Sequence, residues 1–158
     1  MVGDPDDHRP NTKWSLAADP DGKVDIALII EECAVGDGVP LHRHEVDEVV
    51  VVVAGLGEVR LGDETRTVGP GTVMFIAAGE RHGYRNVGDV PLRLHGIFPT
   101  TRLDIEMLER NPAPGTEAEF PRRSVYDART GEIEVLGPSA IGPSAAPGGQ
   151  APPAAFEI

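Results

Sequence analysis

The chain has 158 residues, of which 40% are hydrophobic and 25% are charged, and this size and composition predict one soluble globular domain rather than a multidomain assembly. Its formal net charge of −12, from 14 basic and 26 acidic residues, disfavours nucleic acid and anionic membranes as partners. The 19 glycines and 15 prolines favour short β-strands joined by turns over a helical bundle.

The expected cellular setting follows from the cysteine content and the lack of apolar segments. The single cysteine, Cys33, can form neither an internal disulfide nor a thiolate cluster, and we expect it to be a small buried core residue. The acidic N-terminus lacks the apolar segment of a secretory signal, and no run of about 18 apolar residues could span a bilayer. We therefore expect a cytoplasmic protein without a membrane partner.

Residues 1–22 are predicted to be an N-terminal extension. The segment is polar, contains three prolines, and has Trp14 as its one large apolar anchor. We expect a loose lead-in that docks onto the domain at this tryptophan.

Residues 23–100 are predicted to form a β-sheet domain. Short β-branched or apolar runs alternate with turn signals built from Gly, Pro, Asp and Asn, and no pattern typical of a helix lies between them. This arrangement predicts an antiparallel sandwich or barrel rather than βαβ units. The expected strands cover residues 24–30, 48–53, 59–61, 65–68, 73–77 and 92–98.

One of these strands, Val49 to Val53, is five consecutive valines. A run without alternation predicts a strand that is covered on both faces, and residues 24–30 are similarly apolar. The cover is a second sheet or a second subunit. We expect a homodimer in which the partner relieves an exposed apolar sheet face.

Residues 101–136 are predicted to be a C-terminal extension. Leu103, Met107 and Leu108 would share one face of a short helix over 103–110. Residues 137–158 are dominated by Pro, Ala, Gly and Ser, and they cannot bury enough apolar surface to offset their ordering entropy. We expect this last segment to be a flexible tail.

Three histidines and one glutamate stand beside turn signals in the β-rich region. His42 and His44 are two residues apart, so both imidazoles project from the same face of a strand. Glu48 opens the valine strand in register with its inward-facing valines, where a carboxylate is costly to bury unless a cation or hydrogen bonds compensate it. His82 follows Gly79, where a turn can return the chain to the same cavity.

The spacing of these residues resembles the cupin family. One family motif is matched by Gly36, His42, His44, Glu48 and Gly55, and a second is matched by Gly71, Gly79, His82 and Asn86, with Ala77 in place of the usual proline. The resemblance covers residues 24–99. It implies an all-β fold, an antiparallel jelly-roll barrel that often pairs into dimers. We expect a short C-terminal helix and a flexible tail to be appended to this barrel.

The resemblance also implies one divalent transition metal ion per chain. A mixed set of imidazole and carboxylate ligands without a thiolate suits Fe, Mn, Ni, Co or Zn and leaves one or two coordination positions for a small-molecule substrate or ligand. The implied metal ligands are His42, His44, Glu48 and His82.

Two further residues join Glu48 as catalytic candidates. Tyr84 would share the face of His82, and it is either a pocket-lining donor or acid/base, or a residue that packs at the barrel mouth. His95 would share a face with Arg93 and Ile97, and it is either a satisfied core histidine or a contact to a metal ligand or substrate.

Three functions remain open, because cupins range from dioxygenases and sugar isomerases to non-enzymatic binding proteins and the fold alone does not select among them. The first is a metal-dependent oxygenase or related oxidoreductase, for example a dioxygenase, acting on a small oxygenated organic molecule. The second is a binding module for a metal or small ligand, without turnover. The third is a redox-neutral isomerase, lyase or cyclase in which Tyr84 or His95 moves a proton.

Overall fold

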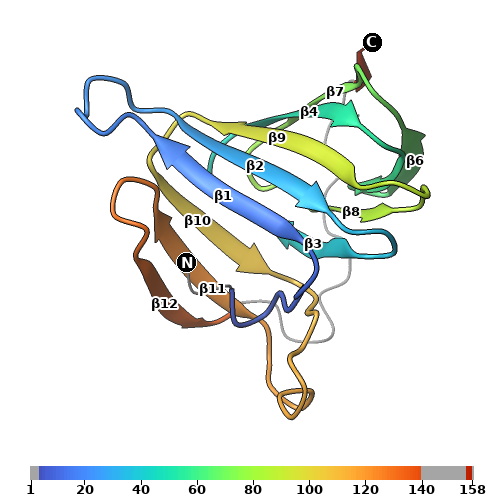
Figure 1. Ribbon diagram of the computed structural model, residues 1–158. Helices are drawn as coiled ribbons and strands as arrows, with labels where there is room; N and C mark the ends of the chain where they lie inside the picture. Colours follow the sequence, from blue (N-terminus) through green and yellow to red (C-terminus); the bar gives the residue numbers. More distant parts are fainter. Residues whose placement is uncertain (1–3, 140–155, 158) are drawn as a thin grey trace.

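The computed structural model describes residues 4–139 and 156–157, which form two antiparallel β-sheets (Figure 1). The predicted all-β, antiparallel architecture is confirmed. The first sheet has the strand order β1-β2-β9-β4-β7-β13, and the second has the order β12-β11-β10-β3-β8-β5-β6. The strands are β1 (Lys13–Ala18), β2 (Ala27–Cys33), β3 (Gly38–Arg43), β4 (Glu48–Ala54), β5 (Gly57–Leu61), β6 (Glu64–Val68), β7 (Val73–Ile76), β8 (His82–Asn86), β9 (Leu92–Phe98), β10 (Arg102–Met107), β11 (Arg122–Asp127), β12 (Ile133–Pro138) and β13 (Phe156–Glu157).

The core lies between the two sheets and consists of two apolar clusters. The larger cluster includes Val50, Met74 and Leu94 from the first sheet, together with Val59 and Leu61 from the second. Cys33 belongs to this cluster and is fully buried, as predicted. Burial raises the pKa of its thiol to about 11, so the side chain stays protonated and acts as a small apolar residue.

The second cluster is built by strands from both ends of the sequence. Its fully buried members include Phe98 and Leu103, and Trp14 packs against it from β1. The indole ring of Trp14 contacts the ring of Tyr126 edge to face, with 6.1 Å between the ring centroids. The barrel interior therefore continues beyond residues 23–100 into β1, β10 and β11.

The segment over 103–110 is not a helix, which corrects the prediction. Arg102–Met107 is strand β10, which pairs with β11 and β3. Leu103, Ile105 and Met107 alternate and all line the interior cavity, so the apolar period is two residues. The intervening Glu106 is accommodated because its carboxylate lies 2.6 Å from the guanidinium of Arg43.

The N-terminal segment is not a loose lead-in. Lys13–Ala18 pairs with β2 along its whole length, and Asp6, further upstream, is only 1% exposed. The Asp6 carboxylate accepts a hydrogen bond from Arg110 Nε at 2.6 Å and another from the backbone N–H of Arg122 at 2.7 Å. These contacts fasten the segment to the C-terminal half of the barrel.

The predicted tail over 137–158 falls largely outside the described residues. Its first residues, Gly137 and Pro138, belong to β12, and Phe156–Glu157 pairs with β7. None of the described residues forms a helix long and apolar enough to cross a membrane.

The outer face of the first sheet is apolar and partly exposed. The valines of β4 alternate: Val50 and Val52 are buried in the core, whereas Val49 and Val51 point to the opposite face. On that face a cross-strand row runs over four strands. Its members are Leu28, Ile97, Val49 and Phe75.

The buried carboxylate of Asp6 generates a prediction about stability. We expect Asp6→Ala to lower the free energy of unfolding by about 3 to 5 kcal/mol, because the buried Arg110 guanidinium loses its buried charge partner and keeps only the more distant, exposed Glu119. A chain of this size should then melt roughly 6 to 20 °C lower, as measured by calorimetry. Asp63→Ala is the matched control, because the Asp63 carboxylate that pairs with Arg81 is 90% exposed. Equal melting temperatures for the two variants would contradict the prediction.

The apolar outer face generates a second prediction, that the chain forms a homodimer through the first sheet. Light scattering should give twice the monomer mass of 16.8 kDa. Phe75→Glu and Ile97→Glu should each yield monomers, because these side chains are 49% and 36% exposed and a charge there would be desolvated in the interface. Thr67→Glu, on an exposed position of β6 in the other sheet, should leave the mass unchanged. A wild-type monomer at every concentration would count against this face as an interface.

Candidate metal centre

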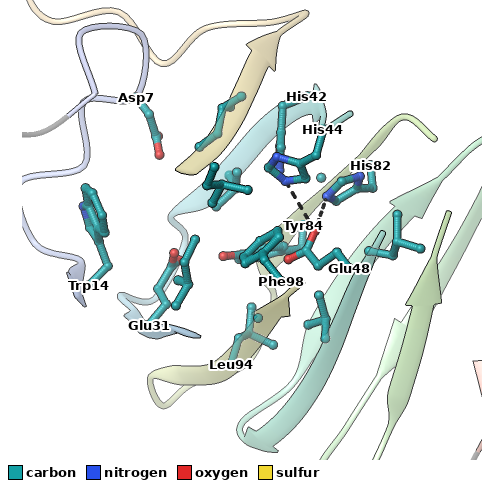
Figure 2. A pocket seen from close by; sticks show the side chains of 18 of the residues that line it. Asp7, Trp14, Glu31, His42, His44, Glu48, His82, Tyr84, Leu94 and Phe98 are labelled. Atoms are coloured by element: carbon teal, nitrogen blue, oxygen red, sulfur yellow. Dashed lines mark ion pairs between the residues drawn. The ribbon is translucent and has the colours of Figure 1, made fainter. Parts of the chain in front are cut away.

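The four predicted metal ligands meet at one end of the barrel interior (Figure 2). His42 lies near the end of β3, His44 follows that strand, and Glu48 and His82 open β4 and β8. Each side chain offers one ligand atom, and these four atoms lie within 4.8 Å of one another. All four residues are buried. The structure therefore brings together the whole predicted set.

Strand pairing and two loop contacts produce this convergence. His42 lies opposite His82 in the register of β3 and β8. The loop before β8 is joined to the loop before β4, because the N–H of Gly79 donates to the carbonyl of His44 at 2.8 Å. The N–H of Ala78 also donates to the carboxylate of Asp47 at 2.9 Å. These two hydrogen bonds hold the loop before β4 against the loop before β8, so the ligands that the two segments carry lie close together.

Backbone carbonyls determine the proton position on each imidazole. The Nδ1 atoms of His42, His44 and His82 lie 2.8, 2.7 and 2.9 Å from the carbonyl oxygens of Pro40, Asp104 and Glu80, respectively. A carbonyl oxygen can only accept, so each Nδ1 donates a proton, and in the neutral ring each Nε2 keeps its lone pair. Burial and the two neighbouring imidazoles also lower the pKa of His42 well below its ordinary value, which favours the neutral ring that binds metals.

Glu48 supplies the negative charge of the cluster. Burial alone would raise the pKa of its carboxyl group, but the imidazoles of His44 and His82 hold that pKa well below the ordinary value. Its Oε2 atom lies 2.8 Å from His82 Nε2 and 3.4 Å from His44 Nε2. The Glu48 side chain is therefore ionised and directed at the imidazole nitrogens.

Two of these atoms are unsatisfied in a way that fits a bound cation. Among the described residues, neither Glu48 Oε2 nor His82 Nε2 has a hydrogen-bond partner, although both are buried. With the only ring proton on Nδ1, the two atoms would face each other with lone pairs, and a buried arrangement of this kind is costly unless a cation, a proton or a metal ion, lies between them. The donor set and its geometry thus fit one divalent ion.

Gly96 on β9 makes room for the Glu48 carboxylate. A Cβ atom at this position would lie 2.8 Å from Glu48 Oε1, closer than non-bonded atoms approach. Sequence reasoning missed this residue, because a glycine within an apolar strand shows only that something approaches closely, not which group does.

A cavity of about 90 Å³ extends from the four ligands into the barrel. Its walls are mostly apolar and include Val50, Met74, Leu94, Phe98 and Leu103. Ligand cavities in proteins are generally of this kind, with few polar groups among apolar walls.

The structure separates the two remaining catalytic candidates. Tyr84 lines the same cavity as Glu31. Burial and Glu31 raise the pKa of Tyr84 well above its ordinary value, so the group is a neutral hydroxyl rather than a base.

His95 is not a residue of the site, which corrects its candidate role. It lies on the outer face of the first sheet, opposite Ile30 of β2 and Val51 of β4. The neighbouring Leu94 and Gly96 face the cavity, and the period of two along β9 places His95 on the other side.

Sequence reasoning also missed a second polar group in the cavity, formed by Arg9 and Glu31. Both line the cavity and are almost fully buried. Glu31 shares its strand face with the buried Ala27 and Cys33. A carboxylate on an apolar strand face is costly to bury without a partner, and this signal, which indicated Glu48, could also have indicated Glu31. Arg9 carried no such signal, because it lies in an irregular polar segment.

Comparisons with known proteins show what this chain is similar to. Residues 29–98 match the family model for the cupin domain. The HTH-type transcriptional activator RhaR of Mannheimia succiniciproducens is 38% identical over 53 residues, which are 34% of this chain and 19% of the activator.

Two solved structures show the same fold. The oxalate decarboxylase of Lactobacillus farciminis, in complex with formate, has a TM-score of 0.59 and 22% identity over 64% of this chain and 32% of that chain. The cupin domain of Schizosaccharomyces pombe Cnp3 has a TM-score of 0.52 and 17% identity over 58% of this chain and 66% of that chain. The similarity thus spans less than two thirds of each of these three proteins, and the two solved structures establish the fold alone.

The cluster generates a prediction about metal content. His82→Ala should weaken binding of a divalent ion by at least roughly tenfold. Removing a residue that only hydrogen-bonds to a metal ligand already lowers metal affinity by about this factor, and removing the ligand itself should lower it at least as much. Metal analysis of protein purified without chelators should show less than one equivalent in this variant, with little change in melting temperature. His95→Ala is the matched control, because that imidazole lies outside the cavity. Wild-type metal content in His82→Ala would refute the assignment of the ligand.

Proposed function

We propose that the chain, whose residues 29–98 match the family model for the cupin domain, is a metal-dependent oxygenase or related oxidoreductase that acts on a small oxygenated organic molecule. The observation that carries the proposal is the convergence of three imidazole Nε2 atoms and one ionised carboxylate on a single point beside a cavity. A divalent transition ion bound there would supply Lewis-acid chemistry and, if redox-active, electron transfer.

The chain's own residues support this function in three ways. Nitrogen and oxygen donors without a thiolate suit Fe, Mn, Ni, Co or Zn, and four protein ligands leave coordination positions free for a substrate. The cavity beside those positions has mostly apolar walls, which disfavour bulk water there. The protonated hydroxyl of Tyr84 provides a polar contact that can orient a bound molecule.

A second candidate function is a small-ligand-binding module without turnover. The observation in its favour is the 38% identity to a transcriptional activator over 53 residues. Such a module needs the cavity and the ion but no reaction. A redox-neutral isomerase, lyase or cyclase is less well supported, since His95, one of the two residues expected to move a proton, lies outside the cavity.

Oxygen consumption provides the test. Protein reconstituted anaerobically with Fe(II) should consume oxygen when it is mixed with the appropriate member of a panel of diketones, enediols, phenols and hydroxy acids. Glu48→Gln should slow this consumption at least roughly tenfold, because the amide replaces the only charged ligand. Glu58→Gln, an exposed position on β5, should retain the wild-type rate.

The other functions give different results in the same experiment. Turnover with Zn(II) and no oxygen demand would support redox-neutral chemistry. Tight ligand binding without turnover under Fe(II), Mn(II), Ni(II) or Zn(II) would support the binding module.

A further inference from the structure

A second group of polar side chains lines the cavity away from the metal ligands. In Figure 2, Asp7 and Trp14 lie on the opposite side of the cavity from the three imidazoles, and Glu31 and Tyr84 lie between them. These residues come from the N-terminal segment, from β2 and from β8. All except Tyr84 lie outside the two family motifs, which span residues 36–55 and 71–86.

The centre of this group is a buried ion pair. Arg9 Nη1 lies 2.5 Å from Glu31 Oε1, and the two side chains are 7% and 4% exposed. Nε lies 2.8 Å from Asp7 Oδ1, and Nη2 lies 2.6 Å from Asp7 Oδ2 and 3.4 Å from Glu31 Oε2. Nη1 also lies 4.0 Å from the Cys33 sulfur. The guanidinium is therefore fully occupied and holds Glu31 in place, and it offers no donor to a ligand.

Glu31 and Tyr84 keep acceptor capacity toward the cavity. An ionised carboxylate accepts about four hydrogen bonds. The described hydrogen bonds of Glu31 come from two nitrogens of Arg9. The Tyr84 hydroxyl can both accept and donate a hydrogen bond. The far part of the cavity thus presents the Glu31 carboxylate as an acceptor, beside the hydroxyl of Tyr84 and the indole N–H of Trp14.

The two ends of the cavity complement different parts of a small molecule. The metal ligands would hold a cation, which attracts an oxygen ligand. The opposite end carries three carboxyl groups, Asp4, Asp7 and Glu31, against the single guanidinium of Arg9. It therefore favours a hydrogen-bond donor or a positive charge.

We propose that Glu31 and Tyr84, held by Arg9, form a specificity subsite that binds a hydrogen-bond donor, a hydroxyl or an ammonium group, on the end of the ligand remote from the metal. The proposal rests on the proposed function, since it takes the metal end as the anchor. The ligand class is a short carboxylic acid or related oxygen chelator that carries a terminal donor.

The size of the cavity limits the length of such a ligand. A cavity of about 90 Å³ accommodates a small molecule. Hydroxy and amino acids of three or four carbons are small enough to serve as probes.

A purely structural role for the ion pair is the alternative. Arg9 also fastens the N-terminal segment to β2, and a buried ion pair contributes little net stability compared with apolar packing. The two roles differ in one respect. A subsite changes the relative affinity of matched ligands, while a structural contact changes only the stability of the protein.

The experiment compares matched acids on the cobalt-loaded protein. Butyrate, 4-hydroxybutyrate and 4-aminobutyrate, with propionate, 3-hydroxypropionate and β-alanine, are titrated while the visible absorption bands of Co(II) report on ligand binding. Wild-type protein should bind a donor-bearing acid at least about tenfold more tightly than the unsubstituted acid of equal length, the effect expected for a hydrogen bond to a charged group. The hydroxy and amino acids distinguish a neutral donor from a cation.

The variants isolate the subsite. Glu31→Gln and Tyr84→Phe should each reduce that preference to less than about threefold, with unchanged cobalt content and unchanged affinity for butyrate. Glu32→Gln is the matched control, because the neighbouring Glu32 faces outward and contacts Arg93. Tyr84→Phe keeps the test valid if Glu31→Gln is poorly folded.

The outcomes separate the two proposals. Equal affinities for substituted and unsubstituted acids in the wild type, with intact cobalt binding, would overturn the subsite and leave the metal function standing. A preference that persists in both variants would also overturn the subsite. Failure of the wild-type protein to bind cobalt would overturn the metal function and the subsite together.

Discussion

The hydrogen bonds from three imidazoles to backbone carbonyls are the constraint on which the candidate metal centre depends. The acceptors are the carbonyls of Pro40, Glu80 and Asp104. Because each carbonyl accepts the Nδ1 proton, three Nε2 lone pairs point at one place and meet the Glu48 carboxylate there. Two of these carbonyls precede their histidine by two residues, whereas the third comes from β10. The site therefore depends on a strand that lies outside both motifs.

The segments outside the motifs also complete the cavity. Strand β1 and the residues before it cover one side of the interior, and β10 and β11 cover another. A jelly-roll interior shared by many proteins thus acquires walls particular to this chain. We propose that Arg9 and Glu31 give this metal site its selectivity among ligands. Neither residue belongs to the two family motifs.

Sequence patterns predicted the features that are determined by residues close together in the chain. The antiparallel β architecture and the metal ligands follow from turn signals, alternation and the interval between His42 and His44. The helix over 103–110 was wrong because Leu103, Met107 and Leu108 fit a helical face, while the charge of Glu106 hid the alternation of β10. The compensating Arg43 lies 63 residues away, and such pairing is invisible in one sequence. For the same reason the anchoring of Asp6 could not be foreseen.

The anchoring of Asp6 has a consequence for the order in which the barrel can be completed. Its partners Arg110 and Arg122 follow it by 104 and 116 residues, so a chain emerging from the ribosome makes its first residues long before the groups that hold them. Contacts of such sequence separation form late, after costly loop closure. We therefore expect the cavity to be sealed late in folding, after a period in which the unpaired strands and the carboxylates of the interior are accessible to water and to chaperones.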